Sequence, residues 1–169
     1  MNVETIAAFG HASGVYAFMN TAYGWPAIES VHFLSLAVLL GTVGLFDLRM
    51  LGVGRGIPLT ALHRLIPFGI GAWLVNLVTG LMFFVSAPDQ YAFNPAFQLK
   101  MAAMAIAGLN VVVFYWVLSR RVHALGPDEV APLSIKLAAG VSLGAWMAVV
   151  MFGRLITYFR PPYHWCFWC

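Results

Sequence analysis

The sequence has few of the charged residues that a water-exposed surface needs, and few cysteines. Only 9% of its 169 residues are Asp, Glu, Lys or Arg, and 62% are hydrophobic, whereas a soluble domain has roughly 25% charged residues. This composition excludes a soluble enzyme and a disordered regulator, and two cysteines are too few for a secreted disulfide scaffold. The basic residues are scattered and form no basic face, so we expect no nucleic-acid partner. The composition predicts an all-α membrane protein.

Four apolar segments are long enough to cross a bilayer, because a helix needs about 20 residues to span the hydrocarbon core. They predict a four-transmembrane-helix bundle that forms one domain over residues 24–160, in contact with membrane lipids. The predicted spans are about Trp25–Leu48, Leu65–Val85, Phe97–Leu118 and Pro132–Phe159.

The two ends of the chain differ from the spans. Residues 1–23 contain two glycines, Glu4 and His11 and no basic stretch, so they resemble neither a cleaved signal peptide nor a span. We expect Val3–Met19 to form one short helix at the membrane interface. Residues 161–169 form an aromatic tail, which is typical of an interfacial belt or of docking onto another protein.

The basic residues predict an orientation, because short loops rich in Lys and Arg stay in the cytoplasm. Six of them fall on one side of a four-span arrangement and three on the other, which predicts a bacterial inner-membrane protein with both termini in the periplasm. The six are Arg49, Arg55, Arg64, Arg120, Arg121 and Lys136, and the three are Lys100, Arg154 and Arg160.

An ionisable residue inside a span indicates a function or a specific contact, because burying one at the bilayer centre costs about 2.5–3.5 kcal/mol. Glu29 and His32 share one face of the first span, and Lys100 and Arg154 fall at the same depth in two other spans. We expect these four residues to meet in a pocket near the periplasmic face, where Glu29 pairs with one of the cations and His32 binds a ligand. The alternative is that the cations extend to lipid headgroups and Glu29 caps a helix.

A haem b would need one or two imidazoles, basic groups for its propionates and an apolar slot. His32 is the candidate iron or metal ligand, His11 or His164 the candidate second ligand, and Lys100 and Arg154 the candidate propionate partners. A quinone or copper ion is an alternative cofactor, and a packing or proton-relay role is the alternative for His32.

Cys166 and Cys169 form a C-x-x-C pair without a following histidine, so they do not match the usual haem attachment motif. On an oxidising side of the membrane the pair predicts a local disulfide. Metal binding together with His164, covalent cofactor attachment and an unpaired thiol remain open.

Small and polar residues within the spans predict helix–helix contacts, since membrane helices associate through close backbone approach and interhelical hydrogen bonds. The candidate packing residues are Asn76, Thr79, Asn110, Gly140 and Gly144.

Several short motifs, taken in order, resemble a bacterial family of small four-helix inner-membrane proteins without an assigned function. That family is distantly similar to copper-resistance D-type and cytochrome-b-like membrane proteins, which implies a redox or metal-linked role for Glu29, His32, Lys100 and Arg154. The first 23 residues and the cysteine tail lie outside the resemblance. The motifs are Ile28–Leu34, Gly41, Phe46–Gly52, Thr79–Leu81, Asn94–Lys100, Gly108–Asn110, Gly153–Ile156 and Tyr158.

Three functions follow as hypotheses. The first is a small redox subunit that carries haem b near the periplasmic face and transfers electrons within a larger membrane complex. The second is a non-catalytic accessory subunit of a respiratory or photosynthetic complex, or a homo-oligomer, without a cofactor. The third is a quinone-site or proton-handling protein. An electron-transfer or accessory role is favoured over a stand-alone enzyme.

Overall fold

A computed structural model describes residues 3–54, 56–118 and 131–159. Every regular element in these residues is helical, and four helices are long and apolar enough to cross a membrane. This confirms the predicted all-α fold with four spans and indicates a multi-pass membrane protein. The spans are Gly24–Leu51, Ala61–Ser86, Pro95–Leu118 and Leu133–Tyr158.

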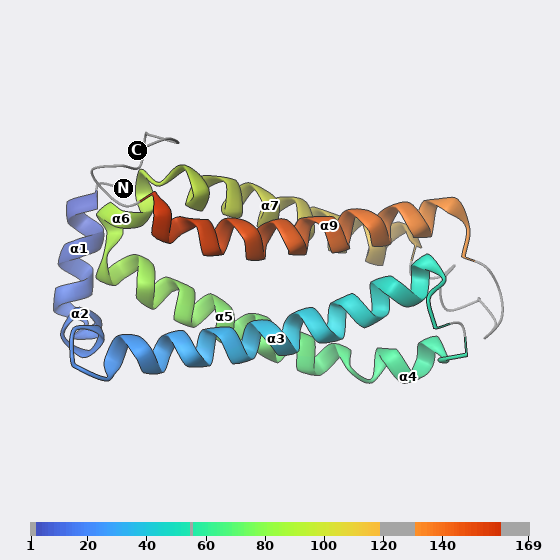
Figure 1. Ribbon diagram of the computed structural model, residues 1–169, viewed down its shortest axis with the longest axis horizontal. Helices are drawn as coiled ribbons and strands as arrows, with labels where there is room; N and C mark the ends of the chain where they lie inside the picture. Colours follow the sequence, from blue (N-terminus) through green and yellow to red (C-terminus); the bar gives the residue numbers. More distant parts are fainter. Residues whose placement is uncertain (1–2, 55, 119–130, 160–169) are drawn as a thin grey trace.

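Four long helices run lengthwise, and short helices lie at their ends (Figure 1). The long helices are α3 (Gly24–Leu51), α5 (Ile66–Ser86), α7 (Pro95–Val113) and α9 (Leu133–Leu155). The π-helix η1 (Phe114–Leu118) extends α7, and the 3₁₀-helix η2 (Ile156–Tyr158) extends α9. The short helices are α1 (Val3–Ala12), α2 (Val15–Met19), α4 (Leu59–His63) and α6 (Pro88–Ala92).

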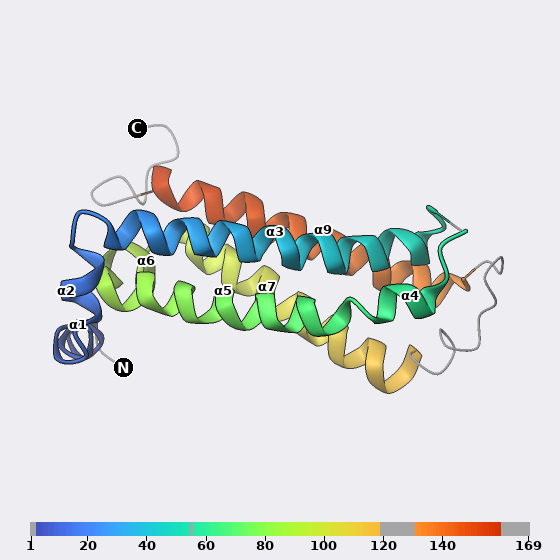
Figure 2. The same cartoon turned by 90° about the horizontal axis from the view of Figure 1, so that it is seen from below.

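The two ends of the bundle are built differently, as two perpendicular views show (Figures 1 and 2). Helices α1, α2 and α6 gather where α3 begins and α9 finishes; we call this the α1 end. Helix α4 lies at the opposite end, which we call the α4 end. The predicted periplasmic side corresponds to the α1 end.

The third span begins at Pro95, two residues earlier than predicted, because Asn94 caps it. The Asn94 side-chain oxygen accepts hydrogen bonds from the backbone N–H groups of Ala96 (3.0 Å) and Phe97 (3.4 Å), as N-cap residues do. Its amide nitrogen donates to the carbonyls of Ile156 (3.0 Å) and Phe159 (3.1 Å). Asn94 therefore also ties the start of α7 to the end of the fourth span.

The N-terminal segment forms two helices, so the prediction of one helix over Val3–Met19 is wrong. Gly14 has a φ of 75° and separates α1 from α2, and this left-handed conformation costs glycine little. Both helices pack on the α1 end of α5, and α1 also contacts α6. Ile6 and Met19 are buried, whereas Phe9 is exposed.

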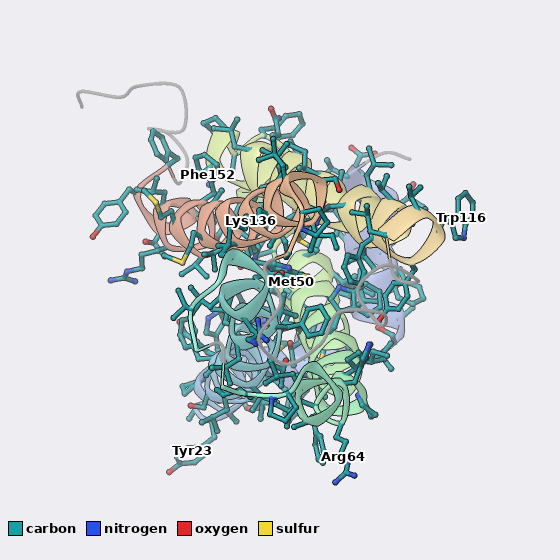
Figure 3. The ribbon with its side chains drawn as sticks, turned by 90° about the vertical axis from the view of Figure 1, so that its right-hand side faces the viewer. Tyr23, Met50, Arg64, Trp116, Lys136 and Phe152 are labelled. Carbon is teal, nitrogen blue, oxygen red and sulfur yellow. The ribbon has the colours of Figure 1, made fainter. Side chains whose placement is uncertain are left out.

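The long helices form two tightly packed pairs, α3 with α5 and α7 with α9, and α3 also packs on α9. One buried cluster lies at the α4 end around Met50, Phe114 and Ile135, and a second lies mid-bundle around Leu39 and Val149. Viewed from the α4 end, Met50 lies toward the middle of the bundle, while Arg64 and Trp116 point outward (Figure 3).

Candidate functional site

His32 is half-buried between α3 and α5, where its Nδ1 lies 2.7 Å from the hydroxyl oxygen of Thr79. The Thr79 hydroxyl also lies 2.7 Å from the carbonyl oxygen of Val75, to which it donates its only hydrogen. The His32 Nδ1 therefore donates to Thr79, which leaves the lone pair of a neutral imidazole on Nε2. Gly80 gives the ring room, because a Cβ there would lie 3.8 Å from His32 Cε1.

Lys100 is half-buried and crosses from α7 to α9. Its Nζ, Cε and Cδ atoms lie 3.6–3.8 Å from the position that a Cβ on Gly153 would occupy. His32 lies eight residues into α3 and Lys100 five residues into α7, and both helices begin at the α1 end (Figure 1), so the two residues lie at a similar depth in the bundle. The structure therefore places both residues in the half of the bundle nearest the α1 end, and a shared site for the pair stays a prediction.

Glu29 and Arg154 lie on the outside of the bundle, apart from His32 and Lys100. Both side chains are exposed, and neither forms an ion pair with another residue in the described ranges. The expected pairing of Glu29 with Lys100 or Arg154 is therefore wrong, because Glu29 lies on the outer face of α3, one turn before His32.

The candidate second ligands of an iron are not found beside His32. His11 is exposed on α1, with its ring centroid 4.0 Å from that of Tyr16. His164, Cys166 and Cys169 lie outside the described residues. Within the described part of the chain, no group of three or more His, Cys, Asp or Glu residues is arranged to hold a metal ion.

Three of the predicted packing residues form hydrogen bonds between helices. Asn76 of α5 donates to the Ser35 hydroxyl of α3 at 2.7 Å, next to the contact between Thr79 and His32. Asn110 of α7 donates to the carbonyl of Ala138 in α9 at 3.1 Å.

The predicted close approach at Gly140 and Gly144 is wrong. Both glycines are exposed, and a Cβ at either would meet nothing within 4 Å. The other face of α9 carries the contacts, through Ala138, Ser142 and Ala145, which are buried.

A cavity of about 470 Å³ lies at the α4 end between α3, α5, α7 and α9. Its size is typical of a small-molecule site. Most of its lining is aliphatic or aromatic, and the polar groups come from few positions. The aromatic lining residues are Phe46, Trp73, Phe114, Tyr115 and Trp146, and the polar ones are Thr42, Asp47, Asn110 and Ser142.

Two lining residues bury a polar atom that has no hydrogen-bond partner in the described structure: Oδ2 of Asp47 and Nε1 of Trp146. Asp47 is only 3% exposed, and the side chain of Ser142 lies beside its carboxyl group. Ser142 and Trp146 are one turn apart on the same face of α9, so all three residues line one side of the cavity. A buried polar atom without a partner costs about 1–3 kcal/mol, which a ligand with matching groups would recover.

The cavity opens sideways between α5 and α7. Ile70 and Trp73 of α5 and Val111 of α7 all line it, yet they are 55%, 39% and 43% exposed on the outside of the bundle. Helix α5 diverges from α7 toward the α4 end (Figures 1 and 2), and the two helices make few direct contacts. Because these outer faces are apolar parts of spans, the opening faces lipid.

Sequence reasoning missed this site. Neither Asp47 nor Trp146 is among the candidate site residues predicted from the sequence. The available signal was an acidic residue still inside an apolar span, with Ser142 and Trp146 spaced i, i+4 in another span.

Comparison with known proteins gives one match. A family described as "Family of unknown function (DUF6644)" matches residues 4–159. The chain belongs to this family. The match includes α1 and α2, so the expectation that residues 1–23 lie outside the resemblance is wrong.

The searches of curated proteins and of solved structures found no match. The distant resemblance to copper-resistance D-type and cytochrome-b-like proteins therefore has no support from these comparisons.

Proposed function

We propose that the protein is a quinone-binding membrane subunit that holds a lipid-soluble quinone in the cavity at the α4 end. The observation that carries this proposal is the coincidence of an apolar cavity with two buried, unpartnered polar atoms, Asp47 Oδ2 and Trp146 Nε1. This function corresponds to the quinone-site hypothesis from the sequence. The proposed site lies at the α4 end, whereas the sequence placed the candidate residues near the periplasmic face.

The surroundings of the cavity favour a ligand that arrives from the bilayer. The opening lies between apolar outer faces of α5 and α7, so a long isoprenoid tail can extend into lipid while the head group lies inside. A water-soluble metabolite would have to cross these faces, which offer it no hydrogen bonds.

The chemistry of the inner wall favours a ring with oxygen atoms on it. The Trp146 N–H is only a donor and needs an acceptor such as a quinone carbonyl. The Asp47 carboxyl group can accept a hydrogen bond from the hydroxyl of the reduced form. Phe46, Phe114 and Trp73 present aromatic faces and edges to a flat ring.

The haem and copper alternatives receive less support. The described lining of the cavity contains no histidine or cysteine, the residue types that ligate haem iron and copper most often. His32 belongs to the other half of the bundle.

The distribution of charge supports an orientation for the proposed subunit. Six of the nine basic residues fall in the connections at the α4 end or within the adjoining helix ends, so we propose that this end faces the cytoplasm of a bacterial inner membrane. The quinone would then be held in the cytoplasmic leaflet, where a redox partner in a membrane complex exchanges it.

Quinone binding tests the proposal directly. The full-length protein in nanodiscs is incubated with a decyl-substituted benzoquinone, and bound quinone is extracted and quantified against empty nanodiscs. We expect saturable binding, weakened roughly twofold to tenfold by Trp146→Phe, because a hydrogen bond contributes about 0.5–1.5 kcal/mol.

Trp116→Phe is the matched control, since Trp116 is 86% exposed and does not line the cavity. Its affinity should stay within twofold of wild type. Equal effects of the two substitutions, or no binding above empty nanodiscs, would refute the proposal.

A further inference from the structure

The lateral opening of the cavity has a rim made of two rows of residues, one on α5 and one on α7. Within each row the residues repeat every three or four positions, so they share one face of their helix. All of them line the cavity, and all are at least partly exposed on the outside of the bundle. The α5 row is Ile66, Ile70 and Trp73, and the α7 row is Met104, Gly108, Val111 and Tyr115.

Gly108 leaves a gap in this rim. It is exposed, and a Cβ at this position would meet nothing within 4 Å. Gly108 lies thirteen residues after the start of α7, and Trp73 lies thirteen residues before the end of α5; both of these helix ends are at the α1 end (Figure 1). At 1.5 Å per residue, both positions are about 20 Å from that end. The gap in the α7 row therefore lies at a similar depth to Trp73 in the α5 row.

Helix packing does not explain the glycine at this position. Gly69, which also lines the cavity, is buried, and a Cβ there would lie 2.8 Å from the Thr42 hydroxyl oxygen of α3. Gly69 therefore allows α3 and α5 to approach closely. Gly108 has no such neighbour, although glycine inside a helix is less favourable than alanine. Its missing side chain instead leaves free space between the cavity and the surrounding lipid.

We propose that Gly108 forms the passage through which the hydrocarbon tail of a quinone leaves the cavity. Gly108 is then the residue that allows the site to accept a quinone with a long alkyl or isoprenoid tail. This inference rests on the quinone site proposed above. A cavity of about 470 Å³ is too small to enclose the head group together with such a tail, so the tail has to cross the rim. Every other rim position carries a branched, aromatic or thioether side chain.

The test compares two quinones that share one head group, a decyl-substituted benzoquinone and the same benzoquinone without the decyl chain. The dissociation constant of each quinone is measured with the full-length protein in nanodiscs. For each quinone, the value for a variant is divided by the value for wild type. This ratio removes the difference between the two quinones in how strongly they partition into lipid.

Gly108→Leu should weaken binding of the decyl quinone roughly fivefold or more, because the leucine side chain and the tail would occupy the same space. Gly108→Ala should weaken it less, since it adds a single carbon atom. Binding of the tailless quinone should change little in either variant. Its head group does not lie across the rim when bound, and an equilibrium constant does not depend on the route of entry.

Gly140→Leu is the matched control. Gly140 is also an exposed glycine inside a span with nothing within 4 Å of its Cβ position, but it does not line the cavity. The control should therefore leave the binding of both quinones unchanged. The melting temperature of Gly108→Leu should equal that of wild type or exceed it, because leucine favours a helix over glycine. A melting temperature several degrees lower would show that Gly108 serves packing and would overturn the inference.

Two binding results would also overturn it. Weaker binding of both quinones to Gly108→Leu would place Gly108 in the wall around the head group, and unchanged binding of the decyl quinone would mean that the tail leaves elsewhere. Either result would leave the quinone site itself standing. A wild-type protein that binds neither quinone would instead contradict the proposed function, and this inference with it.

Discussion

Asp47 and Trp146 show how single residues place hydrogen-bonding atoms inside a largely apolar bundle. Each places a polar atom in a largely apolar wall without supplying a partner for it from the described chain. The polar residues that hold helices together behave differently: Asn76, Asn110 and Thr79 form hydrogen bonds to a neighbouring helix. The contrast separates residues that pack helices from residues available to a ligand.

Replacing Asp47 by leucine tests this distinction. Leucine removes the polar atom and fills a similar volume, and Ser142 can donate to a backbone carbonyl of its own helix instead. We expect quinone binding to weaken about twofold to tenfold while the melting temperature in detergent stays equal or rises, because replacing a buried polar group by an apolar one is often neutral or stabilising. A melting temperature several degrees lower would show that Asp47 is structural.

At this scale the sequence predicts some residues and not others. His32 and Lys100 are recognisable because an ionisable residue inside an apolar run is costly wherever it points. Whether such a residue faces a neighbour or lipid depends on the rotation of its helix. The spans are apolar all round, so the sequence carries little periodic signal for that rotation. Glu29 and Arg154 were therefore assigned to the interior but lie outside.

At the scale of helices, glycine positions decide which elements approach closely. A Cβ on Gly10 of α1 would lie 2.6 Å from the carbonyl oxygen of Val85 in α5, a contact that neither backbone can accept without moving. Gly140 of α9 meets nothing within 4 Å. The same residue type thus marks a helix crossing in one place and an exposed surface in the other.

Alanine substitutions at these two glycines should have opposite effects. Gly10→Ala should destabilise the protein by about 1–3 kcal/mol, because α1 must move away from α5. Gly140→Ala should be neutral or stabilising by up to about 1 kcal/mol, since alanine favours a helix over glycine. Thermal unfolding in detergent measures both, and a loss of stability at Gly140 that equals the loss at Gly10 would contradict the described packing.

The extent of the helices was predictable to within a few residues, because the length of each apolar run sets each span. The ends of the helices depend on local contacts and backbone conformation, which the length of an apolar run does not predict. The Asn94 cap starts α7 two residues earlier than predicted, and the positive φ of Gly14 divides the N-terminal segment into two helices. The small-xxx-small spacing of Gly140 and Gly144 was misleading, because spacing identifies a shared helix face but not what covers it.

At the scale of the whole molecule, the cavity results from how the helices are paired. Helices α3 and α5 form one pair, α7 and α9 the other, and α3 joins them through α9. The fourth side, between α5 and α7, stays open toward lipid at the α4 end. The sequence predicts four spans but not which spans pack against each other. The cavity could therefore not be predicted from the sequence.

Photoaffinity labelling tests the central claim most directly. The protein in nanodiscs is illuminated with an azido-substituted benzoquinone, and the labelled residues are identified by peptide mass spectrometry. We predict labelling of cavity-lining segments, residues 39–50, 104–115 and 138–146, which excess unlabelled quinone abolishes. Labelling confined to lipid-facing residues such as Trp116 and Leu133, or labelling that unlabelled quinone does not reduce, would contradict a quinone site in this cavity.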